Sequence, residues 1–242
     1  MPIDMTKRAD VAKASLIKVL TEEDAKGIDL GEITANIILV NDYSISMEDR
    51  YDGAVNEVQE LGERALGLSL SGLDNDGKVQ IFFFDDKAYD PIEVHAKNYP
   101  GYVDRWRNPR FKPKRRFGGT DYLPVIDKII DFCTSKGMLA AGQPPVLVIF
   151  MTDGATANER EITHRLVSAA SLPIFWQFLG LGYTPRFLRK LDTMGGRAVD
   201  NVGLFEIPAV LSLTDEEFYD KIIDEFVRKW IPAARTARIL AR

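Results

Sequence analysis

Short runs of apolar residues alternate along the chain with longer segments in which apolar residues recur every three or four positions. Four short runs, at 37–40, 79–84, 145–151 and 173–179, are typical of strands that are buried on both faces. The longer segments between them predict amphipathic helices. Strands that alternate with helices in this way predict an α/β fold, with a mostly parallel central sheet and helices on both faces.

Turn and capping residues set the expected bounds of the elements. The apolar spacing predicts one helix over about 49–67, which Gly67 would end, and Pro124 fits the first turn of another helix. We also expect a weak strand at 92–94 and a strand at 197–205. Thr184 is expected to cap a helix in which Pro185 is the first residue. A last helix should run from a Thr214–Glu217 capping box to Pro232.

The length of 242 residues fits one large α/β domain with short additions. We assign residues 1–34 to an N-terminal extension, 35–231 to the main domain and 232–242 to a C-terminal tail. Helical spacing of apolar residues is visible inside the extension, and Gly27 would stop that helix.

Charge and cysteine content narrow the function classes. The net charge of −5 and the pI of about 5.2 disfavour nucleic acid as a partner. There is no signal-peptide pattern and no apolar run long enough to span a bilayer, so the sequence favours the cytoplasm. The single cysteine, Cys133, lies on a helical apolar stripe, which predicts a core residue and excludes a disulfide within the chain.

Oxygen-bearing side chains follow the first core strand. Asp42 ends the strand, and the hydroxyls of Ser44 and Ser46 come two and four residues later. One carboxylate with two hydroxyls is a hard oxygen set, which suits Mg²⁺, with Ca²⁺ or Mn²⁺ as alternatives, better than zinc.

Two further residues are expected to join this group. Asp153 follows the third core strand, and Thr120 follows two glycines at the entry to a helix. Right-handed crossovers bring the ends of parallel strands to one edge of the sheet. If the first and third core strands are neighbours, Asp42 and Asp153 face the crevice at the switch point of the sheet. Five side chains, some acting through water, would leave one position on the metal for a carboxylate of a protein partner.

The pattern Asp42-x-Ser44-x-Ser46, with Thr120 and Asp153-Gly154 later in the chain, resembles the metal-ion-dependent adhesion site of von Willebrand factor type A (vWA) domains, over roughly residues 35–230. Segments that look more narrowly like the copine-like domain of tellurium-resistance (Ter) proteins of the TerF type are 173–178, Leu191-Asp192 and 199–205. The resemblance implies a Rossmann-like vWA fold, Mg²⁺ at the site, and binding rather than catalysis. It also implies partnership with other Ter proteins in bacterial stress-response complexes. Many relatives have glycine where this chain has Ile45, and we expect this difference to influence partner choice.

Two other functions remain open from the sequence. A Mg²⁺-dependent hydrolase, such as a phosphatase, would also use a strand-end aspartate, although the residue two positions after Asp42 is Ser44 rather than a second acid. The basic segment 105–116, with Trp106 and Phe111, could bind phosphate groups or anionic lipid, as in a copine-like protein at the inner face of the membrane. The same segment could also be a solvated loop, or rim the metal crevice and attract an acidic partner.

Overall fold

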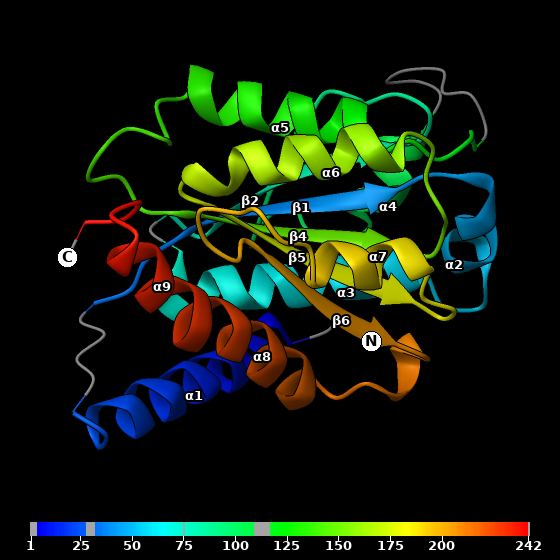
Figure 1. Ribbon diagram of the computed structural model, residues 1–242. Coiled ribbons are helices and arrows are strands. Elements are labelled where there is room, and N and C mark those ends of the chain that lie inside the picture. The colour runs from blue at the N-terminus through cyan, green and yellow to red at the C-terminus, as the bar shows by residue number, and fades with distance from the viewer. Residues whose placement is uncertain (1–3, 28–31, 75, 109–116, 242) are drawn as a thin grey trace.

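The computed structural model describes residues 4–27, 32–74, 76–108 and 117–241, and its centre is a six-stranded sheet with the order β3-β2-β1-β4-β5-β6 (Figure 1). All neighbouring strands are parallel except β2 and β3, which are antiparallel. The strands are β1 (Asn36–Asp42), β2 (Lys78–Phe84), β3 (Ile92–His95), β4 (Val146–Thr152), β5 (Ile174–Leu181) and β6 (Val202–Ile207). The mostly parallel α/β sheet predicted from the apolar runs is therefore confirmed.

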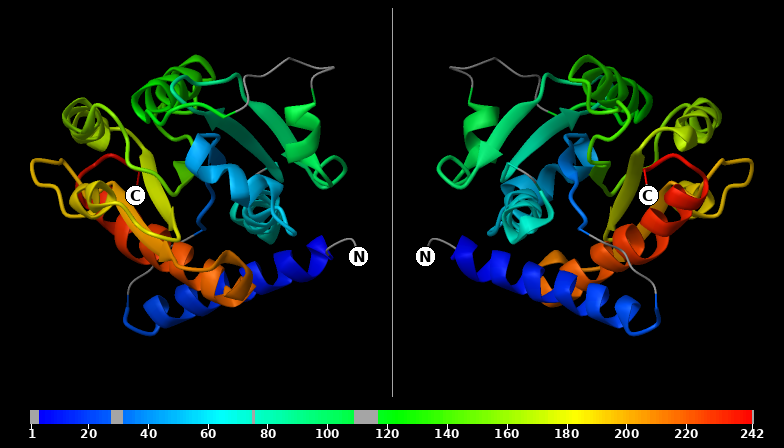
Figure 2. Two further views of the ribbon diagram at one scale, coloured as in Figure 1. Left: turned by 90° about the vertical axis from the view of Figure 1, so that its right-hand side faces the viewer. Right: turned by 90° about the vertical axis from the view of Figure 1, so that its left-hand side faces the viewer.

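Helices cover both faces of this sheet, as Figures 1 and 2 show. One face carries α5 (Leu123–Ser135), α6 (Glu159–Ser168) and α7 (Arg186–Asp192). The other carries α1 (Met5–Asp24), α3 (Glu57–Leu68), α4 (Tyr102–Arg107), α8 (Asp215–Ile223) and α9 (Ile231–Thr236), and the short α2 (Glu48–Asp52) follows β1. None of the helices in the described part of the chain is long and apolar enough to cross a bilayer.

The two hydrophobic cores explain why the strands are apolar on both faces. Successive residues of a strand point to opposite sides of the sheet. In β1, Ile38 and Val40 pack under α5 and α6, whereas Ile37 and Leu39 pack with the helices of the other face. Cys133 is buried in the core under α5 and α6, as its position on an apolar stripe predicts.

The single helix predicted over 49–67 is wrong, because two helices, α2 and α3, occupy this range. Gly53 has extended backbone angles and interrupts the helical path, and the side chain of Asn56 then caps α3 by accepting from Gln59 N at 2.9 Å. Val55 lies in the break and is exposed, although its spacing placed it on the apolar stripe. Gly67 lies inside α3 and does not end it.

Three other predicted bounds are shifted. Thr184 does not cap α7, because Pro185 occupies the N-cap position without a side-chain hydrogen bond. The strand predicted at 197–205 begins only at Val202, since Arg197 donates to Asp192 O at 3.2 Å and pairs with Asp200 at 2.5 Å in a loop. Pro232 does not end the last helix. It lies in the first turn of α9, which continues directly from a wider π-helical turn.

Several local predictions are confirmed. Thr214 and Glu217 form a complete capping box at the start of α8, and Pro124 lies in the first turn of α5. The weak strand at 92–94 is β3, the antiparallel edge of the sheet.

Helix α1, which precedes the first strand, packs against α3 and α8, and its residues Ala12, Leu16 and Val19 belong to the hydrophobic core of that face. Figure 2 shows α1 lying along the outside of the helical layer. This region therefore shares a core with the sheet and its helices.

Close packing between α3 and α4 makes Gly62 sensitive to substitution. A side-chain carbon at Gly62 would lie 2.7 Å from two ring atoms of the fully buried Tyr102, whose hydroxyl donates to Val58 O. We expect Gly62→Ala to lower the free energy of unfolding by about 1–3 kcal/mol in urea denaturation, because overpacking outweighs the better helix propensity of alanine. Gly195→Ala is the control, since no described atom lies within 4 Å of its added carbon. Equal stability of the two variants would contradict the prediction.

Candidate metal centre

The candidate site lies at the carboxyl edge of β1 and β4, which are direct neighbours in the sheet. The condition on which the sequence argument depended, that the first and third core strands are neighbours, is therefore met. In the sheet, β2 and β3 lie on one side of β1, whereas β4, β5 and β6 lie on its other side. The strand order therefore reverses between β1 and β4, and α/β proteins bind ligands at such a switch point.

Asp42 is completely buried at the end of β1. Its Oδ1 accepts from Ser44 N at 2.8 Å, and its Oδ2 accepts from the Thr152 hydroxyl at 2.6 Å. The Tyr51 hydroxyl donates to the Asp42 carbonyl at 2.7 Å and fixes the backbone. Burial, with a smaller contribution from the negative charge of Asp153, raises the pKa of Asp42 to about 7 against the lowering effect of these hydrogen bonds.

The two serines present their hydroxyls side by side. Ser44 Oγ and Ser46 Oγ are 3.1 Å apart, with Ser44 buried and Ser46 exposed. Ile45 N donates to Gly118 O at 2.9 Å, so the loop after β1 is tied to the Gly118-Gly119 segment that leads to Thr120. The Ile45 side chain is 69% exposed.

Thr120 and Asp153 complete the group. A side-chain carbon built at Gly154 would lie 3.2 Å from Ser46 Oγ and 3.3 Å from Thr120 Oγ1, so the missing side chain of Gly154 leaves room where these hydroxyls converge. Ala157 N donates to Thr120 O at 3.1 Å and joins the two loops. The structure thus brings together Asp42, Ser44, Ser46, Thr120 and Asp153, which are far apart in the sequence.

The chemistry of this group fits a hard cation. Asp153 Oδ1 is buried and has no hydrogen-bond partner among the described residues. Such an atom is costly unless an ion or water satisfies it. Across the described ranges, no group of three or more His, Cys, Asp or Glu residues could hold a metal, so any ion here would depend on hydroxyl ligands as well as the two carboxylates. Oxygen ligands of this kind suit Mg²⁺.

Sequence reasoning missed two residues of the site. Thr152 connects the site to the helix layer, because it donates to Asp42 and exchanges a hydrogen bond with the Tyr122 hydroxyl at 3.2 Å. Arg50 Nε donates to Asp153 Oδ2 at 3.3 Å. Thr152 could have been identified from the sequence, because it directly precedes Asp153 at the end of a strand. No local pattern in the sequence marks Arg50.

The basic segment 105–116 is described only as far as residue 108, and residues 109–116, including Phe111, lie outside the described residues. Its beginning is helical in α4, which its two prolines did not suggest. Trp106 is buried and stacks on Phe83, with ring centroids 3.6 Å apart, so its ring is not available to a ligand of the basic segment. Arg107 pairs with Asp52 at 2.7 Å, and Arg105 donates to the carbonyls of Asn98 and Pro100.

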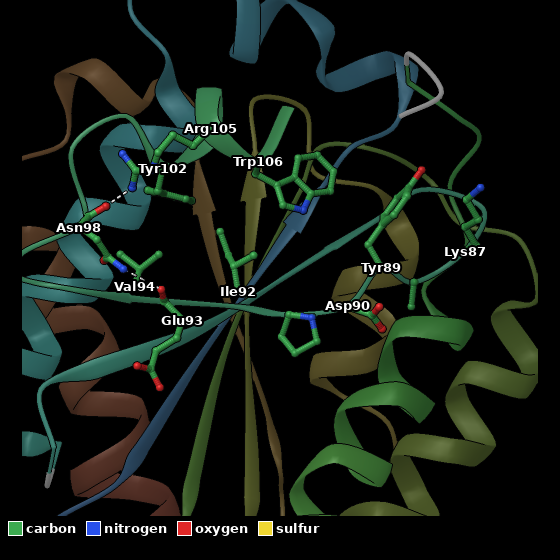
Figure 3. Close-up of a pocket in the computed structure, with 12 residues that line it drawn as sticks. Lys87, Tyr89, Asp90, Ile92, Glu93, Val94, Asn98, Tyr102, Arg105 and Trp106 are labelled. Atoms are coloured by element: carbon green, nitrogen blue, oxygen red, sulfur yellow. Dashed lines mark hydrogen bonds between the residues drawn. The ribbon is translucent and has the colours of Figure 1, made fainter. Parts of the chain in front are cut away.

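A cavity of about 630 Å³ lies beside β3 and α4 (Figure 3). None of the five candidate ligands lines it. The side chain of Asn98 accepts a hydrogen bond from His95 N at 2.8 Å and donates one to Glu93 O at 3.1 Å. It thus satisfies backbone groups of the edge strand β3 that do not pair with β2. This contact protects the edge of the sheet against addition of another strand.

Comparisons with known proteins agree with this architecture. The family model for the vWA domain found in the TerF C terminus matches residues 34–240. The uncharacterized protein YcbR of Bacillus subtilis is 29% identical over 235 residues, which cover 96% of this chain and 89% of that protein.

Two solved structures share the fold. The VWA domain of SpRpn10 superposes with a TM-score of 0.51 and 10% identity, covering 80% of this chain and 95% of that domain. Proximal thread matrix protein 1 from the mussel byssus superposes with a TM-score of 0.50 and 17% identity over 80% of this chain, which spans about half (48%) of that protein.

Proposed function

This chain belongs to the vWA family found at the C terminus of TerF, and from that premise we propose that it is a metal-ion-dependent protein-interaction module. The family match confirms the resemblance seen in the sequence, and the vWA fold is one typical of interaction modules. In the proposal, Asp42, Ser44, Ser46, Thr120 and Asp153 hold Mg²⁺, and an acidic side chain of a partner completes its coordination.

One observation carries this proposal. Five oxygen-bearing side chains from three separate loops meet at the switch point, and the buried Oδ1 of Asp153 has no partner there among the described residues. Three of the five groups are neutral hydroxyls. Two carboxylates only balance the two positive charges of Mg²⁺, and the hydroxyls add no negative charge, so a partner carboxylate could still fill an open coordination position of the ion.

Exposed apolar side chains at the same edge support a protein partner. Ile45 lies between the two serines and is 69% exposed, and Tyr183, two residues after β5, is 78% exposed. Aromatic side chains such as tyrosine are enriched in protein interfaces. We propose that the partner is another Ter-type protein in a bacterial tellurium-resistance or stress-response complex in the cytoplasm.

The alternatives receive less support from the site. A phosphatase of the kind considered from the sequence would carry a second acidic residue two positions after Asp42, and that position is Ser44, which contacts Ser46. For lipid binding, Arg105 and Arg107 are both engaged by neighbouring groups. Binding rather than catalysis is therefore the function we propose, and membrane association remains a prediction from the sequence.

Removal of one hydroxyl tests the metal site directly. Thr120→Val keeps the shape of the side chain and removes its oxygen, and we expect Mg²⁺ affinity measured by calorimetry to fall at least on the order of tenfold, since even outer-sphere partners of a metal contribute that much. Thr134→Val on α5 is the control, because the Thr134 hydroxyl donates to Ile130 O in its own helix at 2.7 Å. Unchanged Mg²⁺ binding by Thr120→Val would remove Thr120 from the site.

The interaction itself is tested with co-expressed Ter-type proteins in Mg²⁺ and in chelator. We expect the complex to form in Mg²⁺ and to dissociate in chelator, while circular dichroism shows that the fold is unchanged. A partner that binds equally well in chelator would exclude the metal-dependent mechanism.

A further inference from the structure

Arg50 joins the candidate metal centre to three other parts of the fold. From helix α2, its Nε donates to Asp153 Oδ2 at 3.3 Å and its Nη1 pairs with Glu57 Oε2 at 2.6 Å at the start of α3. All three side chains are mostly buried. One guanidinium thus fixes the relative positions of α2, α3 and the loop after β4.

Contact with Arg50 makes the two oxygens of Asp153 different. Oδ2 faces the guanidinium, whereas Oδ1 is buried and has no partner among the described residues. A carboxylate that was free to rotate could offer either oxygen or both to an ion. With Oδ2 held by Arg50, the side chain presents Oδ1 alone in one orientation.

The third side of the guanidinium is closed by the end of β5. A side-chain carbon at Gly182 would lie 2.5 Å from Arg50 Nη2, so the backbone there approaches the guanidinium as closely as only glycine permits. Gly182 also has a positive φ of 71°, which favours glycine. Arg50 is therefore confined by Asp153, Glu57 and Gly182.

We propose that Arg50 is a positioning residue of the metal centre, which holds Asp153 so that Oδ1 alone is directed to the ion. This inference rests on the proposed function, because it assumes that Asp153 is a ligand. The positive charge of Arg50 would by itself repel a cation, but Glu57 lies at 2.6 Å and balances it. The net effect of Arg50 on the ion is therefore to orient the Asp153 carboxylate. Groups that orient a metal ligand typically change metal affinity by about 10- to 100-fold.

The test removes the contact that orients Asp153 and leaves the net charge around the site unchanged. The double variant Arg50→Gln with Glu57→Gln loses one positive and one negative charge, and its matched control is Arg165→Gln with Asp127→Asn, an Arg–Asp pair at 2.5 Å between α6 and α5. Affinities for Mg²⁺ and for Ca²⁺ are measured by calorimetry on the full chain. Arg50→Lys, which keeps the charge but cannot bridge both carboxylates, serves as a second variant if the double variant does not fold.

We expect the double variant to bind Mg²⁺ about 10- to 100-fold more weakly and Ca²⁺ with a smaller loss, because Mg²⁺ demands strict octahedral geometry and Ca²⁺ does not. The ratio of Mg²⁺ to Ca²⁺ affinity should therefore fall, while the control stays at the wild-type ratio. Arg50→Lys should shift the ratio in the same direction by less.

Three other results would overturn the inference. Unchanged or tighter Mg²⁺ binding by the variants would show that Arg50 does not orient Asp153, and it would leave the proposed function intact. An equal loss for both ions would indicate a purely structural role of Arg50. A wild-type protein that binds neither ion would overturn this inference together with the proposed metal site.

Discussion

Replacing Asp42 with asparagine should abolish Mg²⁺ binding and, at pH 8, should raise the free energy of unfolding of the metal-free protein. The carboxylate of Asp42 is completely buried between Ser44 and Thr152. An ionised group in this position is costly without a cation, because burial disfavours the charged form. Asparagine has nearly the same shape and no charge, and the Thr152 hydroxyl can accept a hydrogen bond from its amide.

The sign and size of this effect follow from the pKa of Asp42. Burial raises it from 3.8 to about 7 in the folded protein. Between these pH values the folded state binds a proton that the unfolded state has lost, so the free energy of unfolding decreases as pH rises from about 4 to above 7. The full difference is on the order of 4 kcal/mol, and it is absent below the unfolded pKa. Mg²⁺ binds the ionised form, so its affinity should increase as pH rises through about 7.

Urea denaturation in chelator at pH 5 and pH 8, for wild type and Asp42→Asn, measures this directly. The variant should lose much of the decrease in stability that wild type shows between the two pH values. Asp127→Asn, at an exposed carboxylate of α5, should leave the decrease unchanged. Mg²⁺ should stabilise wild type at pH 8 and have no effect on Asp42→Asn. Wild-type Mg²⁺ affinity in Asp42→Asn would contradict the assignment of Asp42 as a ligand.

The candidate ligands could be predicted because their information is local. Asp42, Ser44 and Ser46 lie within one short loop, and Asp153 directly follows a strand whose apolar run is unambiguous. Their meeting point then depended on the adjacency of β1 and β4, which the sequence left open and the sheet order supplies.

Arg50 could not be found in this way because its role arises from contacts across the chain. Asp153 lies 103 positions away, and Gly182 approaches the guanidinium from the end of β5. The break between α2 and α3 was missed for a related reason. The apolar spacing around Val55 continues that of a helix, while Gly53 and the capping side chain of Asn56 interrupt the backbone. Periodicity records which residues are apolar, and it contains no information on where the backbone turns.

Replacing Arg8 with alanine should destabilise the protein by about 3–5 kcal/mol, the typical cost of leaving buried charges unpaired. Arg8 lies on α1 with only 7% of its side chain exposed, and it pairs with Glu60, with Glu63 at 3.5 Å and with Asp215 at 3.2 Å. Arg64 would then remain beside these carboxylates, through its contacts with Asp215 at 2.8 Å and Glu60 at 3.3 Å. Burial already raises the pKa of Glu63, so its ionised form is disfavoured even with Arg8 in place.

The comparison with Lys18→Ala separates a buried network from an ordinary surface pair on the same helix. Lys18 is 54% exposed and pairs with Asp220 at 2.9 Å, so its loss should cost at most about 1 kcal/mol in the same urea denaturation experiment. A single transition with a lower midpoint in Arg8→Ala would show that α1 unfolds together with the sheet, although the family match begins only at residue 34. Equal stability of the two variants would instead mean that α1 contributes little to the cooperative unit. Because α1 contacts α3, and Glu57 at the start of α3 binds Arg50, the first outcome would place α1 in the same cooperative unit as the elements that position the candidate site.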